Sequence, residues 1–343
     1  MKNVILKTKY VLLALIIAVT FSCSNDDEPN IATDPIVKDV YVCGYIFNGT
    51  KNVATYWKNG IATSLTDGTQ NARAYAITVV GDDVYVAVGE LSAAKYWKNG
   101  TAIALSDGTN SSGSQDITVV NGDVYVSGFE YNGSQRRAKY WKNGIAIPLS
   151  GNSSSTSTIA VVNNDVYVAG YEYDGSQRRA KYWKNGIAIP LTDGTQAAAA
   201  SAMTVIEDNV YVSGFEFNGS KNVAKYWKNN ISTPLTDGTQ TAGTTAITTI
   251  EDDIYVSGFE FNGSKNVAKY WKNDIAMPLT NGTEDSSTTA ITVIGSDVYV
   301  AGYEESNNGA KNVAKYWKNG IATSLVIDAV QDSKALGLFI TTK

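Results

Sequence analysis

The chain contains no histidine among its 343 residues, and it has only two cysteines and six prolines. Without histidine, imidazole general bases, Ser-His and Cys-His nucleophiles and metal sites with a histidine ligand are all excluded. Positive charge is also in short supply, because 28 Lys and Arg stand against 33 Asp and Glu and leave a net charge of −5. Nucleic acid is therefore not an expected partner, since phosphate neutralisation requires a basic face.

Long hydrophobic runs are equally scarce. The longest, Val11–Phe21, is interrupted only by Thr20 and falls short of the roughly 20 residues that a membrane-spanning helix needs. In contrast, the 30 Gly, 21 Tyr and seven Trp favour strands joined by tight turns. Hydrophobic residues make up 43% and charged residues 18%, so the chain can form a core and is not disordered.

The start of the chain is typical of an export signal. Three lysines precede the apolar run and the small residue Ser22 follows it, which is the usual order of a secretory signal. Cys23 comes next, and the segment Val19-Thr20-Phe21-Ser22-Cys23 resembles the lipobox of bacterial lipoproteins. The acidic stretch Asp26-Asp27-Glu28 resembles the tract after the cysteine in surface-exported lipoproteins of the Bacteroidetes type. An ordinary cleaved signal with a chance cysteine is the alternative.

This resemblance implies a division of the chain and an address. Residues 1–22 would be a lipoprotein signal peptide, residues 23–35 a lipidated acidic tether, and residues 36–343 the folded domain. Cys23 would carry the lipid and anchor the exported protein to the outer membrane or cell surface, with the membrane as a partner. The second cysteine, Cys43, is expected to be a small buried residue, and a reactive thiol is the alternative.

Internal repetition is the strongest pattern in the sequence. A Tyr-Trp pair recurs with spacings of 40, 44, 42, 44, 44 and 46 residues. Residues 36–343 therefore hold seven units of about 44 residues. The tryptophans of the pairs are Trp57, Trp97, Trp141, Trp183, Trp227, Trp271 and Trp317.

Each unit is expected to form four short antiparallel strands. In the third unit these are residues 116–120, 123–131, 137–142 and 145–149, with tight turns at Asn121-Gly122 and Asn143-Gly144. Seven such units predict an all-β fold, a seven-bladed β-propeller. The first unit lacks a full first strand, so we expect the C-terminal segment Ala335–Thr341 to complete its blade and close the ring.

The expected strand order places the longer and more varied loops on one face, which is the candidate binding face. Three types of candidate ligand-binding residue recur in the units: a glutamate at the end of the second strand, an arginine across the hairpin, and the tryptophan of the Tyr-Trp pair. The alternatives are structural, namely packing between blades for the tryptophans and cross-strand ion pairs for the charged residues. The candidates are Glu130, Arg137, Trp141, Glu172, Arg179, Trp183, Glu216 and Glu260.

Other patterns point to no chemistry. The Thr-Asp-Gly-Thr runs, such as the one at Asp67, lack the alternating oxygen ligands of calcium loops and are interpreted as turns. Asp116, a lone carboxylate at the start of an inner strand, is only a weak catalytic hint. No metal and no other cofactor is expected.

The function expected from the sequence is that of a monomeric, lipid-anchored and non-enzymatic binding platform for a glycan or protein ligand. The argument against catalysis is the near identity of the units, because an active site needs different groups converging on one point. Three alternatives remain: a multivalent lectin-like propeller, a polysaccharide-degrading enzyme that uses carboxylates, and a purely structural envelope protein.

Overall fold

The computed structural model describes residues 37–90, 93–306, 309, 311–326 and 331–342. The chain divides into a first unit, Met1–Thr33, and a compact second unit, Asp34–Lys343. The predicted signal peptide, Cys23 and the predicted tether therefore lie outside the described residues. Within the described part of the chain, no helix has the length and hydrophobicity needed to cross a membrane.

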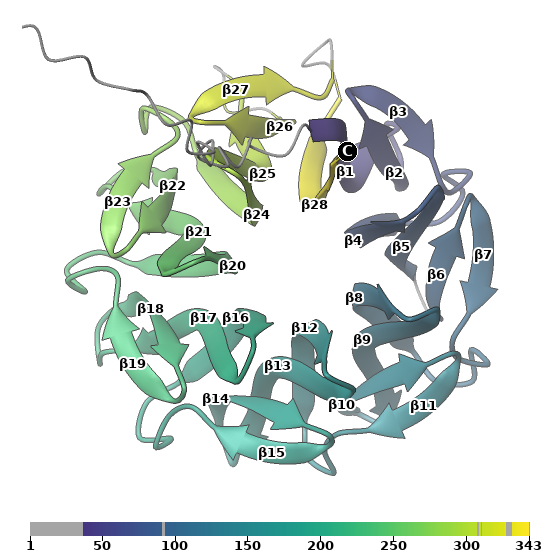
Figure 1. Cartoon of the computed structure of the whole chain (residues 1–343), viewed down its shortest axis with the longest axis horizontal. Coiled ribbons are helices and arrows are strands. Elements are labelled where there is room, and N and C mark those ends of the chain that lie inside the picture. The colour runs from purple at the N-terminus through teal and green to yellow at the C-terminus, as the bar shows by residue number, and fades with distance from the viewer. Residues whose placement is uncertain (1–36, 91–92, 307–308, 310, 327–330, 343) are drawn as a thin grey trace, which may run out of the picture. The chain divides into compact units, whose positions relative to one another are not determined.

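The second unit is a ring of seven antiparallel sheets of four strands each, as Figure 1 shows. We name the sheets blades A to G and give the strands of each from the central channel outward. Blade A consists of β28 (Ser333–Thr342), β1 (Val37–Phe47), β2 (Asn52–Lys58) and β3 (Ile61–Ser64). Blade B consists of β4 (Ala72–Val80), β5 (Asp83–Glu90), β6 (Ala94–Lys98) and β7 (Thr101–Ala104), and blade C of β8 (Ser112–Val120), β9 (Asp123–Asn132), β10 (Gln135–Lys142) and β11 (Ile145–Pro148).

The remaining four blades follow the same order. Blade D consists of β12 (Ser154–Val162), β13 (Asp165–Asp174), β14 (Gln177–Lys184) and β15 (Ile187–Pro190), and blade E of β16 (Ala198–Ile206), β17 (Asn209–Phe217), β18 (Asn222–Lys228) and β19 (Ile231–Pro234). Blade F consists of β20 (Ala242–Ile250), β21 (Asp253–Phe261), β22 (Asn266–Lys272) and β23 (Ile275–Pro278), and blade G of β24 (Ser286–Ile294), β25 (Asp297–Glu305), β26 (Asn312–Lys318) and β27 (Ile321–Ser324). The predicted all-β, seven-bladed propeller is confirmed.

The C-terminal strand closes the ring. β28 pairs with β1 in antiparallel register, with Phe339 opposite Tyr41 and Ala335 opposite Gly44. A buried cluster that contains Trp57, Ala301 and Ala335 then fills the gap between blades G and A. The predicted closure is confirmed, because the two ends of the ring contribute strands to one sheet and β28 pairs with the inner edge of β1.

The Lys-Asn pair after each tryptophan builds the turn between the third and fourth strands. In blade C, Asn143 has a positive φ of 50° and Gly144 one of 82°, the conformation that two-residue hairpins require. The Asn143 side chain donates to Asp123 at 2.7 Å and accepts from the backbone N–H of Val124 at 2.8 Å. Lys142 completes the contact with an ion pair to Asp123 at 2.9 Å. The repeated motif therefore fastens this turn to the start of the second strand.

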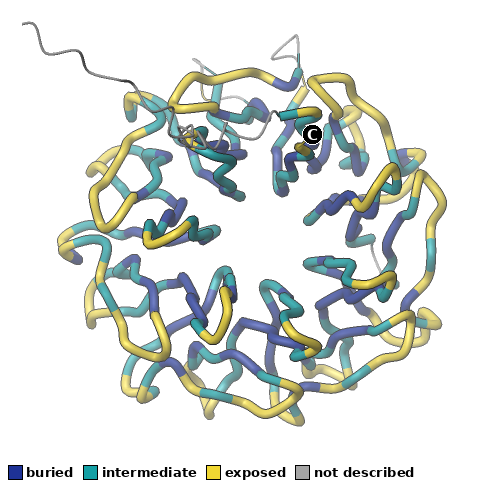
Figure 2. Tube along the Cα trace, in the orientation of Figure 1, coloured by how far each residue is buried: buried dark blue, intermediate teal, exposed yellow. Residues whose placement is uncertain are grey.

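The hydrophobic core lies between blades rather than inside one of them. In the gap between blades B and C, Trp141 is 1% exposed and packs in a cluster with Tyr85 and Tyr96. In the next gap, Trp183 is also 1% exposed and packs with Tyr125 and Tyr140. Figure 2 shows burial concentrated within the blades and exposure along the outer strands and turns. Both sides of a blade are apolar because each side faces a neighbouring blade.

The inner strands are longer than predicted and each contains a bulge. In blade C the inner strand begins at Ser112, four residues before the predicted start at Asp116, and the register shifts between Ser114 and Asp116. Such a bulge leaves one residue unpaired and interrupts the alternation of side chains. The bulged residues of blades A to G are Leu336, Tyr75, Gln115, Ser157, Ser201, Thr245 and Thr289.

Asp116 fastens blade C to blade D. Its carboxylate accepts hydrogen bonds from the Thr158 hydroxyl at 2.7 Å and from the Ile159 backbone N–H at 2.9 Å. Burial raises the pKa of Asp116 above its usual value of 3.8, although these hydrogen bonds and the one from Ile117 N–H act in the opposite direction. These contacts give the Asp116 carboxylate a structural role, whereas the sequence offered it only as a weak catalytic hint.

The raised pKa predicts a pH dependence of stability. The folded state holds the Asp116 proton more tightly than the unfolded state, so the free energy of unfolding should fall as pH rises from 3.8 through the folded-state pKa. Asp116→Asn removes this titration, and wild type should therefore gain stability relative to the variant as the pH is lowered. Urea unfolding of both proteins between about pH 3.5 and pH 7 measures the difference. A difference that stays constant with pH would contradict the assignment.

Candidate functional site

The binding face predicted from the sequence carries a cavity of about 570 Å³. We call this face the hairpin face, because it holds the hairpins between the second and third strands of each blade. The cavity, which we call the B–C pocket, is bordered by blades B and C with one residue of blade A. A volume of this size suits a small ligand such as one or two sugar rings. Its lining residues are Asn52, Asn71, Arg73, Tyr75, Gly89, Glu90, Ser111, Ser112, Gly113, Ser114, Gln115, Phe129, Tyr131 and Arg136.

The B–C pocket lies where one unit departs from the repeat. Position 89 in blade B is glycine, whereas the other six blades have an aromatic residue at the matching place of the second strand. The space is partly taken by Tyr75, since a Cβ atom added at Gly89 would come within 2.7 Å of the Tyr75 ring. The aromatic residues at the matching positions of the other blades are Tyr45, Phe129, Tyr171, Phe215, Phe259 and Tyr303.

The bulged residues of blades B and C add to this asymmetry. Tyr75 and Gln115 are large polar side chains at a position where four of the other blades have serine or threonine. Together with Arg136 they also border a second cavity of about 610 Å³ at the central channel. These three side chains therefore lie where the B–C pocket meets the channel, and Tyr75 is 37% exposed.

Arg136 is an incompletely satisfied cation in this pocket. Its guanidinium carbon lies 3.6 Å from the centre of the Phe129 ring, and its Nε is buried without a hydrogen-bond partner. Burial lowers the pKa of Arg136, although nearby tyrosines oppose this effect. Among the described residues no carboxylate forms an ion pair with Arg136, so its charge is only partly compensated.

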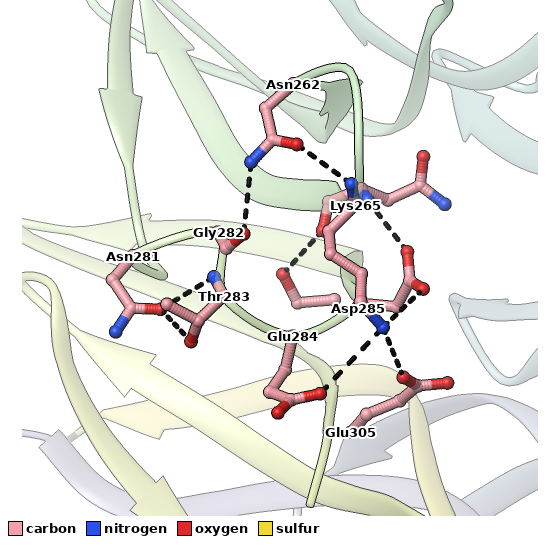
Figure 3. A network of polar contacts seen from close by, with 10 residues as sticks. Asn262, Lys265, Asn281, Gly282, Thr283, Glu284, Asp285 and Glu305 are labelled. Atoms are coloured by element: carbon pink, nitrogen blue, oxygen red, sulfur yellow. Dashed lines mark hydrogen bonds and ion pairs between the residues drawn. The ribbon is translucent and has the colours of Figure 1, made fainter. Parts of the chain in front are cut away.

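A cluster elsewhere on the hairpin face shows the opposite arrangement (Figure 3). Lys265 Nζ lies 3.3 Å from carboxylate oxygens of both Asp285 and Glu305, and 3.9 Å from one of Glu284. Hydrogen bonds to Glu305 and Asp285 raise the pKa of Lys265 above its usual value. One cation here meets three acids, whereas in the B–C pocket the single acid, Glu90, is already paired with Lys95 at 2.6 Å.

The tryptophans proposed as ligand contacts have almost no exposed surface. Trp141 and Trp183 are each 1% exposed and belong to the clusters between blades. A sugar needs an open aromatic face on which to stack, so the burial of these two side chains favours the packing alternative, and their ligand-binding role stays a prediction.

The predicted glutamates form ion pairs with a lysine that the sequence reasoning did not single out. Glu130 of β9 lies opposite Arg137 of β10 in the strand register. Its carboxylate nevertheless forms an ion pair with Lys139, two residues after Arg137 on β10. Lys139 Nζ also lies 5.8 Å from the centre of the Trp141 ring. The same pairing recurs in Glu172–Lys181, Glu216–Lys225, Glu260–Lys269 and Glu304–Lys315.

The two predicted arginines lie apart from the B–C pocket. Arg179 pairs with Asp174, and Arg137 donates to Gln135 at 3.0 Å. Burial acts to raise the pKa of Glu172. Hydrogen bonds from Lys181, Ser150 and Asn152 act in the opposite direction and hold this pKa below its usual value. The predicted set is thus distributed over four blades and does not converge on one cavity, so its ligand-binding role stays a prediction.

The turn interpretation of the Thr-Asp-Gly-Thr runs is confirmed. Asp67 accepts hydrogen bonds from the backbone N–H of Thr69 at 2.9 Å and from its hydroxyl at 2.7 Å. Over the described ranges, no group of three or more His, Cys, Asp and Glu side chains is arranged to hold a metal ion.

Cys43 is fully buried, burial raises the pKa of its thiol, and its Sγ contacts the Ala74 carbonyl oxygen at 3.5 Å. The prediction of a small buried residue is confirmed.

The sequence already held a signal for the missed pocket. The first two tryptophans are 40 residues apart, which is the shortest spacing in the series, and the shortening falls between Gly89 and Lys95. This shortened unit is the one that lacks the aromatic residue. Attention to the deviating unit, instead of the average unit, would have singled out Gly89 and its neighbours.

Comparison with solved structures finds propellers at very low sequence identity. A prolyl endopeptidase matches with a TM-score of 0.50 at 10% identity, over 90% of this chain and 51% of that chain. A putative TolB from Agrobacterium tumefaciens has a TM-score of 0.47 at 6% identity, over 89% of this chain and 98% of that chain. Dipeptidyl peptidase 4 from Porphyromonas gingivalis has a TM-score of 0.46 at 8% identity, over 84% and 51%. No protein-family model and no curated protein sequence matches.

The seven four-stranded sheets define the class, a seven-bladed β-propeller, and the likeness to the prolyl endopeptidase corrects one prediction. The chain spans about half the length of the two peptidase chains that it matches. The prediction that the protein is not an enzyme rested on repeat symmetry, and it is wrong as an inference because the same fold forms part of a prolyl endopeptidase. The seven-bladed fold by itself therefore does not exclude catalysis.

Proposed function

We propose that this propeller is a binding protein whose ligand occupies the B–C pocket on the hairpin face. One observation supports this most directly: the largest departure from the repeat, at Gly89, coincides with a cavity of about 570 Å³ that combines aromatic and polar side chains. Identical units provide a rigid ring, and a deviating unit provides a site with its own chemistry.

The composition of the pocket favours a polar ligand with an apolar face. Tyr75, Phe129 and Tyr131 offer aromatic surface, while Asn52 and Asn71 offer amide groups. Aromatic surface combined with amides and charged groups suits a saccharide, whose ring has a CH face and a rim of hydroxyls. The proposal refines the lectin-like alternative: it has one principal binding site, the B–C pocket, whereas the sequence suggested several equal sites.

The cellular setting is also part of this proposal. Cleavage of a signal peptide of residues 1–22, followed by acylation of Cys23, would hold the propeller at the outer membrane or cell surface on the tether of residues 23–35. A monomeric ring on this acidic tether could then meet glycans or proteins outside the cell. Labelling of the exported chain with radioactive palmitate tests the anchor, and Cys23→Ala should abolish the label.

Binding at the pocket is tested with a glycan panel and Tyr75→Ala. We expect the purified wild-type chain to bind at least one saccharide of the panel, and Tyr75→Ala to weaken that binding about fivefold or more, since stacking on one exposed aromatic ring is worth roughly 1 kcal/mol or more. Ser201→Ala changes the matching bulged residue of blade E and should leave binding within about twofold. Loss of binding in both variants, or in neither, would contradict the assignment.

A further inference from the structure

The B–C pocket contains two guanidinium groups and one neutralised acid. Arg73 and Arg136 both line it, and neither forms an ion pair among the described residues. Its one carboxylate, Glu90, is held by Lys95 at 2.6 Å. The pocket therefore carries a local excess of two positive charges on a protein whose net charge is −5.

We propose that the B–C pocket recognises an acidic saccharide, whose oxyanion pairs with Arg73 and Arg136. This inference rests on the proposed function and adds the charge class of the ligand. A partly buried guanidinium with an unpaired N–H has lost hydration that no protein group replaces, and an anion restores the missing interaction. Arginine also suits a carboxylate or phosphate geometrically, because its planar fork can donate two parallel hydrogen bonds.

The surroundings orient both arginines without neutralising them. The Arg136 guanidinium carbon is 3.6 Å from the Phe129 ring centre, and that of Arg73 is 5.0 Å from the Tyr45 ring centre. When the side-chain amide of Asn52 is oriented with its oxygen towards Arg73, that oxygen accepts hydrogen bonds from Arg73 Nε at 3.1 Å and Arg73 Nη2 at 3.2 Å. Stacking on rings and bonding to a neutral amide fix the position of a guanidinium while leaving its charge available.

The repeat supplies a matched control for Arg136. Residues 133–149 and 175–191 are identical in sequence, so Arg178 in blade D is the counterpart of Arg136. Arg178, however, lies between two rings, 5.5 Å from the centre of Tyr171 and 5.4 Å from that of Phe215, and it is not part of the B–C pocket. The same residue in the same sequence thus has two surroundings, and only one of them borders the cavity beside Gly89.

Calorimetric titration of the purified chain tests the inference with four probes: glucuronate, galacturonate, glucose 6-phosphate and glucuronamide, the neutral analogue of glucuronate. At least one acidic probe should bind with a dissociation constant below about 10 mM, and glucuronamide should bind at least about tenfold more weakly. Arg136→Gln and Arg73→Gln should each weaken acidic binding about tenfold or more, and Arg178→Gln should change it less than about twofold. The stronger of the uronate and phosphate arms identifies which oxyanion is preferred.

Several results would overturn the inference. No binding of any acidic probe, equal binding of glucuronate and glucuronamide, or equal effects of Arg136→Gln and Arg178→Gln would each do so. Arg73 is exposed, so Arg73→Gln keeps the test valid if Arg136→Gln is found by thermal unfolding to impair the fold. Neutral saccharides that bind wild type but not Tyr75→Ala, without dependence on either arginine, would refute the charge preference and leave the proposed function standing.

Discussion

A chain that ends at Asp332, and so lacks β28 (Ser333–Thr342), is expected to lose the folded ring. Without this strand, β1 exposes its inner edge along the register from Val37 to Ile46, and the cluster between blades G and A loses Ala335. The loss should exceed about 5 kcal/mol, or about 10 °C in melting temperature, and the exposed edge should promote aggregation. Circular dichroism melting and size-exclusion chromatography measure both effects.

Complementation provides the control for this truncation. A synthetic peptide of residues 333–343 should restore the melting transition when added to the truncated chain, because the missing pairing is contributed by a single strand. A truncated chain that melts at the wild-type temperature without peptide would show that the ring does not depend on closure by β28.

Trp141→Ala is expected to produce the largest effect of any single substitution considered. The side chain is 1% exposed and packs with Tyr85, Tyr96 and Val126 in the gap between blades B and C. Truncation of a buried tryptophan to alanine costs about 3 to 5 kcal/mol, from lost burial and from the cavity left behind. Urea unfolding of the variant measures this cost as a lower midpoint at an unchanged slope.

Ile145→Ala is the matched control in the same blade. Ile145 is 71% exposed at the start of β11, so its truncation should change the free energy of unfolding by less than about 0.5 kcal/mol. If Trp141→Ala lost ligand binding at unchanged stability, the packing role assigned to the tryptophans would be wrong.

The fold was predictable because its determinants are local and repeated seven times. Each Asn-Gly turn, such as Asn143-Gly144, demands a positive φ that marks a hairpin, and each strand alternates over a short span. The incomplete first unit and the spare strand at Ala335–Thr341 together implied closure. Propeller topology then determined which loops share a face, and the B–C pocket does lie on the predicted face.

The details of the site were less predictable because they depend on register and on deviations from the repeat. The glutamates were matched with the residue directly opposite, yet Glu130 reaches diagonally to Lys139, which is within range of a long side chain. The bulge at Tyr75 interrupts the period-two alternation of β4, so the sequence pattern does not show that this side chain borders the pocket. The consensus of the seven units does not reveal Gly89, because this position matters through the absence of the aromatic side chain that the other units have.

Gly89→Phe tests the central claim most directly, because it restores the aromatic residue of the repeat and fills the B–C pocket. The added Cβ would displace only the ring of Tyr75, an exposed side chain that can move, so the variant should fold. Titration with the best saccharide of the panel should then show binding weakened about tenfold or more at an unchanged melting temperature. Wild-type affinity in the folded variant would place the ligand elsewhere and contradict the account.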